Sequence, residues 1–190
     1  RTRPWQVLAW SVVAAIGCVI PSAWVQEMIP ELPNWAEQEF DLILRDRWGY
    51  LIIGLLAPLS EEIVFRGEVL GGMMRRGTNK WTAIIVSALL FGLIHLNPAQ
   101  VPFATVVGVM LGILYVKSRS LIPSSILHII NNSLSVLLMN TQFGQSDTTW
   151  TDIIGSPLAV NLLAVALAIA AIRFYFWYWK NRNKKNIVKS

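Results

Sequence analysis

The stretch WTAIIVSALLFGLIHLNPAQVPFATVVGVMLGILYV occupies residues 81–116, and none of its 36 residues carries a formal charge at pH 7. Three further uncharged runs occupy residues 4–26, 120–146 and 153–172. A helix on the surface of a soluble protein places charged residues on its wet face at helical spacing, and these runs offer none. Because roughly 20 mostly apolar residues in a helix cross a bilayer, the runs predict an all-α, polytopic transmembrane helical bundle.

The composition of the chain agrees with this class. Of its 190 residues, 54% are hydrophobic and 14% are charged, whereas about 25% of the residues of a soluble domain are charged. We therefore expect a single integral-membrane domain over residues 1–190. The single cysteine, Cys18, cannot form an internal disulfide, and we expect it to pack within the first span.

The sequence predicts about six spans, of which five follow the uncharged runs and one, at residues 49–74, contains charged residues. The run at 81–116 is divided at Asn97-Pro98, because Pro98 lacks a backbone donor and disfavours helix in the residue before it. Residues 26–47 are acidic and aromatic, and we expect them outside the membrane or at its interface. Since the sequence begins with Arg1 rather than Met, we expect that residues, and with them further spans, can precede it. The predicted spans are residues 5–25, 49–74, 81–96, 100–117, 121–140 and 157–179.

Basic residues mark alternate loops and the C-terminal tail. By the positive-inside rule these loops and both termini face the cytoplasm, which we expect to be that of a bacterium, with the bundle in the inner membrane. The net charge of +5 then reflects topology, and we expect membrane lipid rather than nucleic acid as its partner. Residues 180–190 form a basic cytoplasmic tail. The loop and tail charges are Arg75, Arg76, Lys80, Lys117, Arg119, Lys180, Arg182, Lys184, Lys185 and Lys189.

Polar side chains at membrane depth are costly and mark functional sites by default. In the sequence SEEIVFRGE at residues 60–68, Glu62 and Arg66 stand four residues apart and can pair on one helix face. Glu61 lies about 100° round the helix, without a local partner. The chain contains two histidines, His95 and His128, and both lie in otherwise uncharged spans.

The spacing of these polar groups allows them to meet. His128 and Asn132 share a helix face, and all the groups fall within about two helical turns of one depth. A carboxylate and an imidazole can bind and deprotonate a water molecule, while a second imidazole and an amide can donate to an oxyanion. Alternatively, Glu61, His95 and His128 would hold Zn²⁺ with one open position. The residues leave both possibilities open.

Three motifs carry a resemblance to a known family. The patterns Glu61-Glu62-x-x-x-Arg66, Phe91-x-x-x-His95 and His128-x-x-x-Asn132 resemble the signature motifs of the CPBP (Abi) family of CAAX-protease and bacteriocin-processing membrane proteins, which includes the type II CAAX prenyl endopeptidases. The resemblance extends over about residues 50–140, the expected catalytic core. It implies that Glu61 is the catalytic base and works with His95 on the water.

The same resemblance implies the remaining roles. His128 and Asn132 would stabilise the oxyanion, and Glu62 and Arg66 would shape the site. We expect an intramembrane endopeptidase, without a cofactor, acting on a membrane-associated or lipidated peptide, with zinc as the alternative cofactor. Two other functions are weighed against it: a non-proteolytic bacteriocin-immunity or scaffolding protein of the same fold, and a proton-coupled or ion transporter that relays through Glu61 and Arg66. The sequence does not define the oligomeric state.

Overall fold

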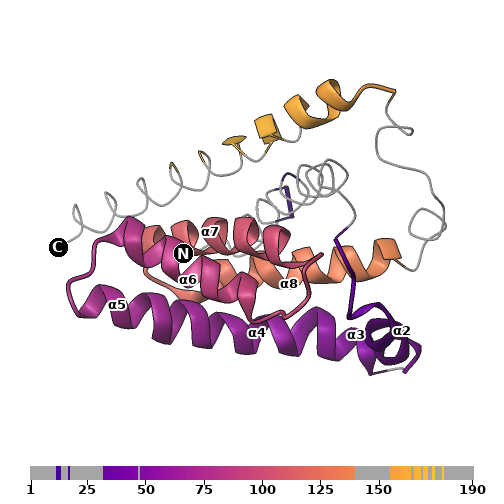
Figure 1. The fold of residues 1–190 in the computed structure, drawn as a ribbon. Helices are drawn as coiled ribbons and strands as arrows, with labels where there is room; N and C mark the ends of the chain where they lie inside the picture. Colours follow the sequence, from indigo (N-terminus) through magenta and orange to yellow (C-terminus); the bar gives the residue numbers. More distant parts are fainter. Residues whose placement is uncertain are drawn as a thin grey trace, which may run out of the picture.

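The computed structural model describes residues 12–13, 17, 32–46, 48–139, 155–163, 165–167, 169–170, 173 and 177. Every regular element in this part of the chain is helical, which confirms the predicted all-α class (Figure 1). Most of the predicted first span, including Cys18, and the basic tail at 180–190 lie outside the described residues.

A long helix forms one side of the bundle and runs without a break from Gly49 to Arg75 (Figure 1). The residues at each internal junction keep right-handed helical dihedral angles. The helix agrees with the span predicted at 49–74. It alternates α-helical and π-helical stretches: α3 (Gly49–Leu51), η1 (Ile52–Leu56), α4 (Ala57–Glu62), η2 (Ile63–Leu70) and α5 (Gly71–Arg75).

Pro58 accounts for the first π-helical stretch. A proline inside a helix has no N–H for the carbonyl four residues earlier, which here belongs to Gly54, and its ring crowds that carbonyl. The Gly54 carbonyl instead accepts a hydrogen bond from Ser133 Oγ at 3.4 Å. In the second stretch, the Phe65 carbonyl accepts from Ser87 Oγ at 3.0 Å. Neighbouring helices thus supply donors to both π-helical stretches.

Three further helices complete the described bundle: α6 (Lys80–Leu93), α7 (Val101–Ser118) and α8 (Leu121–Met139). Helix α6 begins where the Asn79 side chain caps the backbone N–H of Trp81 at 2.9 Å. Helices α6 and α7 pack closely because Gly108 faces Ala88. A Cβ atom added to Gly108 would lie 3.1 Å from the Cα and Cβ atoms of Ala88. Gly108 and Gly112 form a G-x-x-x-G pattern, which is typical of close helix contacts in membranes.

Helix α6 ends earlier than the predicted span 81–96, so this predicted boundary was wrong. The last helical residue is Leu93, and His95 lies in the following turn. The backbone N–H of His95 bonds to the Gly92 carbonyl at 3.3 Å, while the His95 side chain takes the Phe91 carbonyl that this N–H would meet in a continued helix. Leu96 then adopts a left-handed conformation, with φ of 50°, and stops the helix.

The described part of the predicted interfacial segment contains a short amphipathic helix that the sequence reasoning did not predict. This helix, α2 (Glu37–Arg45), lies next to the start of the long helix (Figure 1). Trp35, Leu42 and Trp48 around it are all exposed. Exposed tryptophans beside charged residues are typical of a membrane–water interface.

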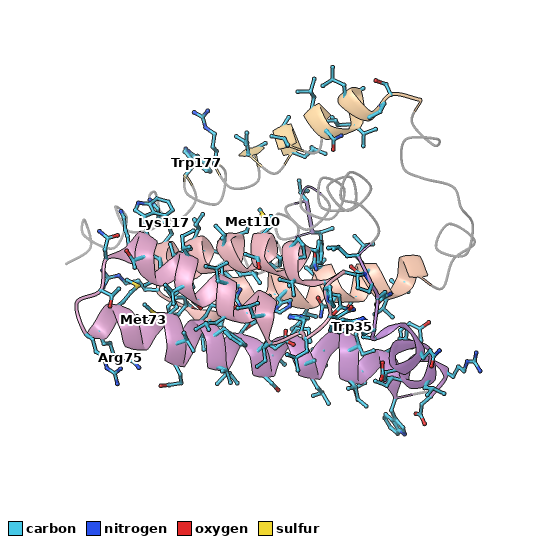
Figure 2. The ribbon with its side chains drawn as sticks, in the orientation of Figure 1. Trp35, Met73, Arg75, Met110, Lys117 and Trp177 are labelled. Atoms are coloured by element: carbon cyan, nitrogen blue, oxygen red, sulfur yellow. The ribbon has the colours of Figure 1, made fainter. Side chains whose placement is uncertain are left out.

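Among the described residues, α7 is the helix that meets a membrane-spanning criterion by length and composition alone. Shorter apolar helices occupy Lys80–Leu93, Leu121–Leu137 and Pro157–Leu167. Arg75 and Lys117 lie toward one end of the bundle and Trp35 lies toward the other (Figure 2). A helical membrane bundle is consistent with this arrangement, and the number of six spans stays a prediction.

Candidate active site

The three sequence motifs meet inside the described bundle. Helices α4 and η2 supply Glu61, Glu62 and Arg66, the end of α6 and its following turn supply Phe91 and His95, and α8 supplies His128 and Asn132. Direct contacts connect these elements through side chains that are far apart in the sequence. Figure 2 shows the side chains of the described residues along these helices.

Glu62 forms the centre of the buried charges. Its side chain is fully buried, and its Oε1 atom lies 2.9 Å from Arg66 Nη1 and 3.0 Å from His128 Nδ1. The ion pair predicted from the four-residue spacing of Glu62 and Arg66 is therefore confirmed. Since a carboxylate oxygen only accepts, Nδ1 of His128 carries the hydrogen of this bond. Glu62 thus fixes both the position and the ring orientation of His128.

The guanidinium of Arg66 is held from three sides. Besides Glu62, its Nη2 atom donates to the Gly108 carbonyl on α7 at 3.2 Å. Its Cζ atom lies 4.5 Å from the centre of the Phe91 ring, in a cation–π contact. Nε and Nη1 of Arg66 have no hydrogen-bond partner among the described residues, so the ion pair and the cation–π contact offset only part of the hydration that this buried cation loses. The three contacts tie the long helix to α6 and α7.

Glu61 is the accessible carboxylate of the site. Its side chain is 28% exposed, and its Oε2 atom lies 3.4 Å from Nε2 of His128 without hydrogen-bond geometry. A carboxylate oxygen and a nitrogen lone pair repel each other, so this approach is attractive only when a proton lies on one of the two atoms. A proton on His128 would balance two carboxylates, Glu61 and Glu62, against two cations, Arg66 and His128. The arrangement can therefore hold and pass a proton.

The second imidazole, that of His95, has one nitrogen occupied. Its Nδ1 atom lies 2.8 Å from the Phe91 carbonyl oxygen, which can only accept. Neutral His95 is therefore the tautomer with hydrogen on Nδ1 and a lone pair on Nε2. Its ring meets the Phe91 ring edge-on, with centroids 5.1 Å apart, and the His128 ring meets the same Phe91 ring at 5.5 Å.

Phe91, which the sequence analysis gave no role beyond its motif position, contacts several groups of the site. Its ring contacts both imidazoles and the Arg66 guanidinium, and it packs edge-on against Phe65 at 5.2 Å. Phe65 and Phe91, with Ala104, form a buried apolar cluster beneath the polar groups. This cluster excludes water from one side of the charged network.

Asn132 is tied to the long helix. Its Nδ2 atom donates to the Ile53 carbonyl in η1 at 3.3 Å, and its Oδ1 atom accepts from Asn131 Nδ2 at 3.4 Å. Asn131 is buried, and its own Oδ1 atom has no hydrogen-bond partner among the described residues. The sequence reasoning chose Asn132 by motif spacing and passed over Asn131. The position of Asn131 directly before Asn132 was the sequence signal that could have identified it as part of the site.

The structure pairs the predicted side chains differently from the resemblance. The resemblance pairs Glu61 with His95 on a water molecule, whereas the imidazole in contact with Glu61 is that of His128. Glu68, the fourth ionisable group of the motif region, lies on the surface and contacts Arg75 at 3.5 Å. The catalytic roles themselves stay predictions.

The zinc alternative can be tested against the donor groups. Among the described residues, no three His, Cys, Asp or Glu side chains are grouped so that they could hold a metal ion. Nδ1 of His128 is bonded to Glu62, so Nε2, which lies 3.4 Å from Glu61 Oε2, is the nitrogen of this ring that could bind a metal. Glu61, His95 and His128 do not form a ligand set in this conformation.

These elements define a helical protein with a buried acid–imidazole site beneath a single accessible carboxylate. Residues 44–134 match the family described as type II CAAX prenyl endopeptidase Rce1-like. This match covers all three motifs and confirms the resemblance read from them.

Three relatives show the range of similar proteins. The chain is 33% identical over 79 residues to UPF0177 protein YxdF of Lactococcus lactis, covering 40% of this chain and 42% of the relative. It is 24% identical over 88 residues to "Putative membrane peptidase YdiL" of Bacillus subtilis, covering 46% and 36%. It is 27% identical over 122 residues to "Probable CAAX prenyl protease 2" of Schizosaccharomyces pombe, covering 54% and 44%.

The chain spans less than half the length of each of these curated relatives. No solved structure gave a significant match.

Proposed function

We propose that this protein is an intramembrane endopeptidase that hydrolyses a peptide bond in a membrane-associated or lipidated peptide. The observation that carries the proposal is the approach of Glu61 Oε2 to within 3.4 Å of His128 Nε2, with Glu61 half-buried and Glu62 fully buried behind His128. The match of residues 44–134 to the Rce1-like family and the similarity to a protein named as a CAAX prenyl protease support the reaction class.

In the proposed reaction, Glu61 removes a proton from a water molecule whose oxygen attacks the carbonyl carbon of the scissile bond. His95 assists through the lone pair on Nε2, which its bond to the Phe91 carbonyl leaves available. The carbonyl oxygen gains negative charge, which is stabilised by the Nε2–H of a protonated His128 and by the Asn132 amide hydrogen that is not bonded to Ile53. Collapse of the tetrahedral intermediate breaks the C–N bond, and the proton held by Glu61 passes to the leaving nitrogen.

The remaining buried groups have a supporting role in this mechanism. Glu62 and Arg66 form an ion pair that holds His128 from behind. Because catalysis needs donors aimed in advance at the developing charge, a fixed His128 lowers the cost of reorganisation in the transition state. No step requires a cofactor.

We also propose that the bundle spans a bacterial inner membrane with the basic loops and both termini on the cytoplasmic side. The length and apolar composition of α7, the aliphatic side chains that are exposed and the shared end of Arg75 and Lys117 support this arrangement. A lipid environment would cover side chains that water would leave as a large apolar surface. Exposed examples are Ile63, Val64, Ile85, Leu89, Leu90, Val106 and Ile122.

The test is cleavage by the full chain purified in detergent or reconstituted in nanodiscs. The probes are a farnesylated peptide ending in a CAAX sequence, its unmodified counterpart and a library of hydrophobic peptides, each with and without a chelator. Cleavage that Glu61→Gln abolishes and Glu68→Gln preserves supports the proposal. Absence of cleavage of every probe by well-folded protein contradicts it and favours a scaffolding or immunity role. Loss of activity with the chelator, restored by zinc, contradicts a reaction without metal.

A further inference from the structure

The turn between α6 and α7 contains a buried polar side chain. Leu96 in this turn is 78% exposed, whereas the next residue, Asn97, is 1% exposed. A fully buried asparagine is unusual, because polar side chains are mostly exposed. Burial of an amide is favourable only where its donor and acceptor are both used, so the partners of Asn97 indicate what the turn requires.

Both ends of the Asn97 amide are used by one distant segment. Its Nδ2 atom donates to Asn34 Oδ1 at 2.8 Å, and its Oδ1 atom accepts from the backbone N–H of Trp35 at 3.1 Å. The backbone carbonyl of Asn97 accepts from Gln100 and Val101 at the start of α7. Asn97 therefore joins three parts of the chain: the segment before α2, the turn, and the first turn of α7.

This junction lies two residues from His95. The Nδ1 bond of His95 depends on a free Phe91 carbonyl, which is free because the His95 N–H bonds to Gly92 instead. If the turn relaxed into one more turn of α-helix, the His95 N–H would take the Phe91 carbonyl and displace the imidazole. The left-handed backbone of Leu96, unfavourable for a residue with a side chain, shows that the turn is held in place by its surroundings.

We infer that Asn97 is a positioning residue for His95: its bonds to Asn34 and Trp35 hold the turn in the conformation that directs His95 Nε2 toward the site. The inference rests on the proposed function, in which His95 assists the attacking water. Asn97 acts through the backbone of the turn and not through a contact with an imidazole. The segment before α2, outside the three motifs, becomes part of the support of the site.

The first test does not depend on activity. The chain has two histidines, so ¹⁵N-histidine labelling gives spectra of two rings, which a His128→Gln variant assigns. We expect His95 of the unaltered protein to show one tautomer, with hydrogen on Nδ1, and Asn97→Ala to show a mixture of tautomers. An unchanged His95 signature in folded Asn97→Ala overturns the inference.

The second test uses a donor–acceptor exchange across the Asn34–Asn97 bond. Asn34→Asp keeps the acceptor that Asn97 needs, and Asn97→Asp keeps the acceptor for Trp35 while the Asn34 amide rotates to donate. We expect Asn34→Asp, at the exposed side of the bond, to keep activity within about threefold, and Asn97→Asp to lower the melting temperature because it buries a carboxylate. The double Asp variant sets two carboxylates against each other, and we expect its kcat to fall more than tenfold with KM within twofold.

The matched control is Asn79→Ala, which removes the cap at the opposite end of α6. It is expected to lower the melting temperature while leaving kcat and the His95 signature unchanged. If Asn97→Ala does not fold, Asn34→Ala removes the same bond from the other side. If Asn34→Ala lowers kcat no more than Asn79→Ala does, with the two variants equally stable, the inference is overturned. If the unaltered protein cleaves nothing, the proposed function fails, while the tautomer measurement still decides the role of Asn97.

Discussion

His128 donates its Nδ1–H to Glu62 Oε1 at 3.0 Å, joining α8 to the long helix across 66 residues of sequence. The same carboxylate oxygen pairs with Arg66, so one fully buried atom fixes a cation and an imidazole together. Glu62 thereby determines the direction in which His128 Nε2 points, which is toward Glu61. The two adjacent glutamates act on opposite nitrogens of one ring, and this geometry separates a supporting carboxylate from an accessible one.

Arg66→Ala should strongly destabilise the protein. The substitution leaves the Glu62 carboxylate buried without its main counter-charge, which costs about 3–5 kcal/mol in comparable buried pairs. The measurement is the unfolding free energy in detergent. Arg75→Ala is the matched control, because Arg75 is exposed and its contact with Glu68 is a surface pair worth at most about 1 kcal/mol. Equal stability of the two variants would show that Arg66 is not buried as described.

Glu61→Gln should abolish most of the peptide cleavage with little effect on folding. Loss of a general base lowers kcat by about 10²–10⁴-fold, and the amide preserves the size of the side chain. Steady-state kinetics on a cleaved probe peptide provide the measurement. Glu68→Gln, on the exposed face of the same helix, should remain within twofold of the unaltered protein. A fully active Glu61→Gln variant would remove Glu61 from the reaction.

Gly108→Ala should loosen the contact between α6 and α7. The added Cβ would lie 3.1 Å from Ala88 and from Cδ1 of the Phe91 ring, so we expect about 1–3 kcal/mol of destabilisation. Because Phe91 contacts both imidazoles, activity should fall as well. The control is Gly67→Ala, whose Cβ would have its nearest neighbour, Leu121 Cδ1, at 3.8 Å. A lower melting temperature for Gly67→Ala than for Gly108→Ala would contradict this packing.

Single cysteines should report opposite sides of the membrane. In a Cys18→Ser background, Gln38→Cys in α2 should react with a membrane-impermeant maleimide added outside intact cells. Arg76→Cys, in the turn after α5, should react only when the cytoplasmic side is exposed, as in inverted vesicles. Reaction of both cysteines from the same side would contradict the proposed topology.

Local patterns predicted those parts of the fold that depend on local physics. The predicted span 49–74 matches the long helix, which begins at Gly49 and ends at Arg75, because the length of a mostly apolar segment is a local property of the sequence. The Glu62–Arg66 pair followed from spacing on one helix. Their similar depths allowed the three motifs to meet, and the contact itself depends on the helix packing.

The features that sequence reasoning missed depend on groups far apart in the chain. The end of α6 at Leu93 depends on the His95 side chain taking a carbonyl from its own backbone, and the burial of Asn97 depends on Asn34, 63 residues away. Which of the two imidazoles faces Glu61 likewise depends on the packing between α4 and α8, which brings His128 to it. The sequence did contain an overlooked signal in Pro58, which marks the first π-helical stretch.

The π-helical stretches change how the long helix must be mapped onto its surroundings. A π-turn closes over five residues rather than four, so each stretch shifts the angular position of every side chain that follows it. A helical wheel drawn at 3.6 residues per turn from Gly49 to Arg75 therefore assigns wrong faces beyond η1 and again beyond η2. Deleting one residue from η2 would keep the helix but rotate α5, and the arginine at its end, away from their present neighbours.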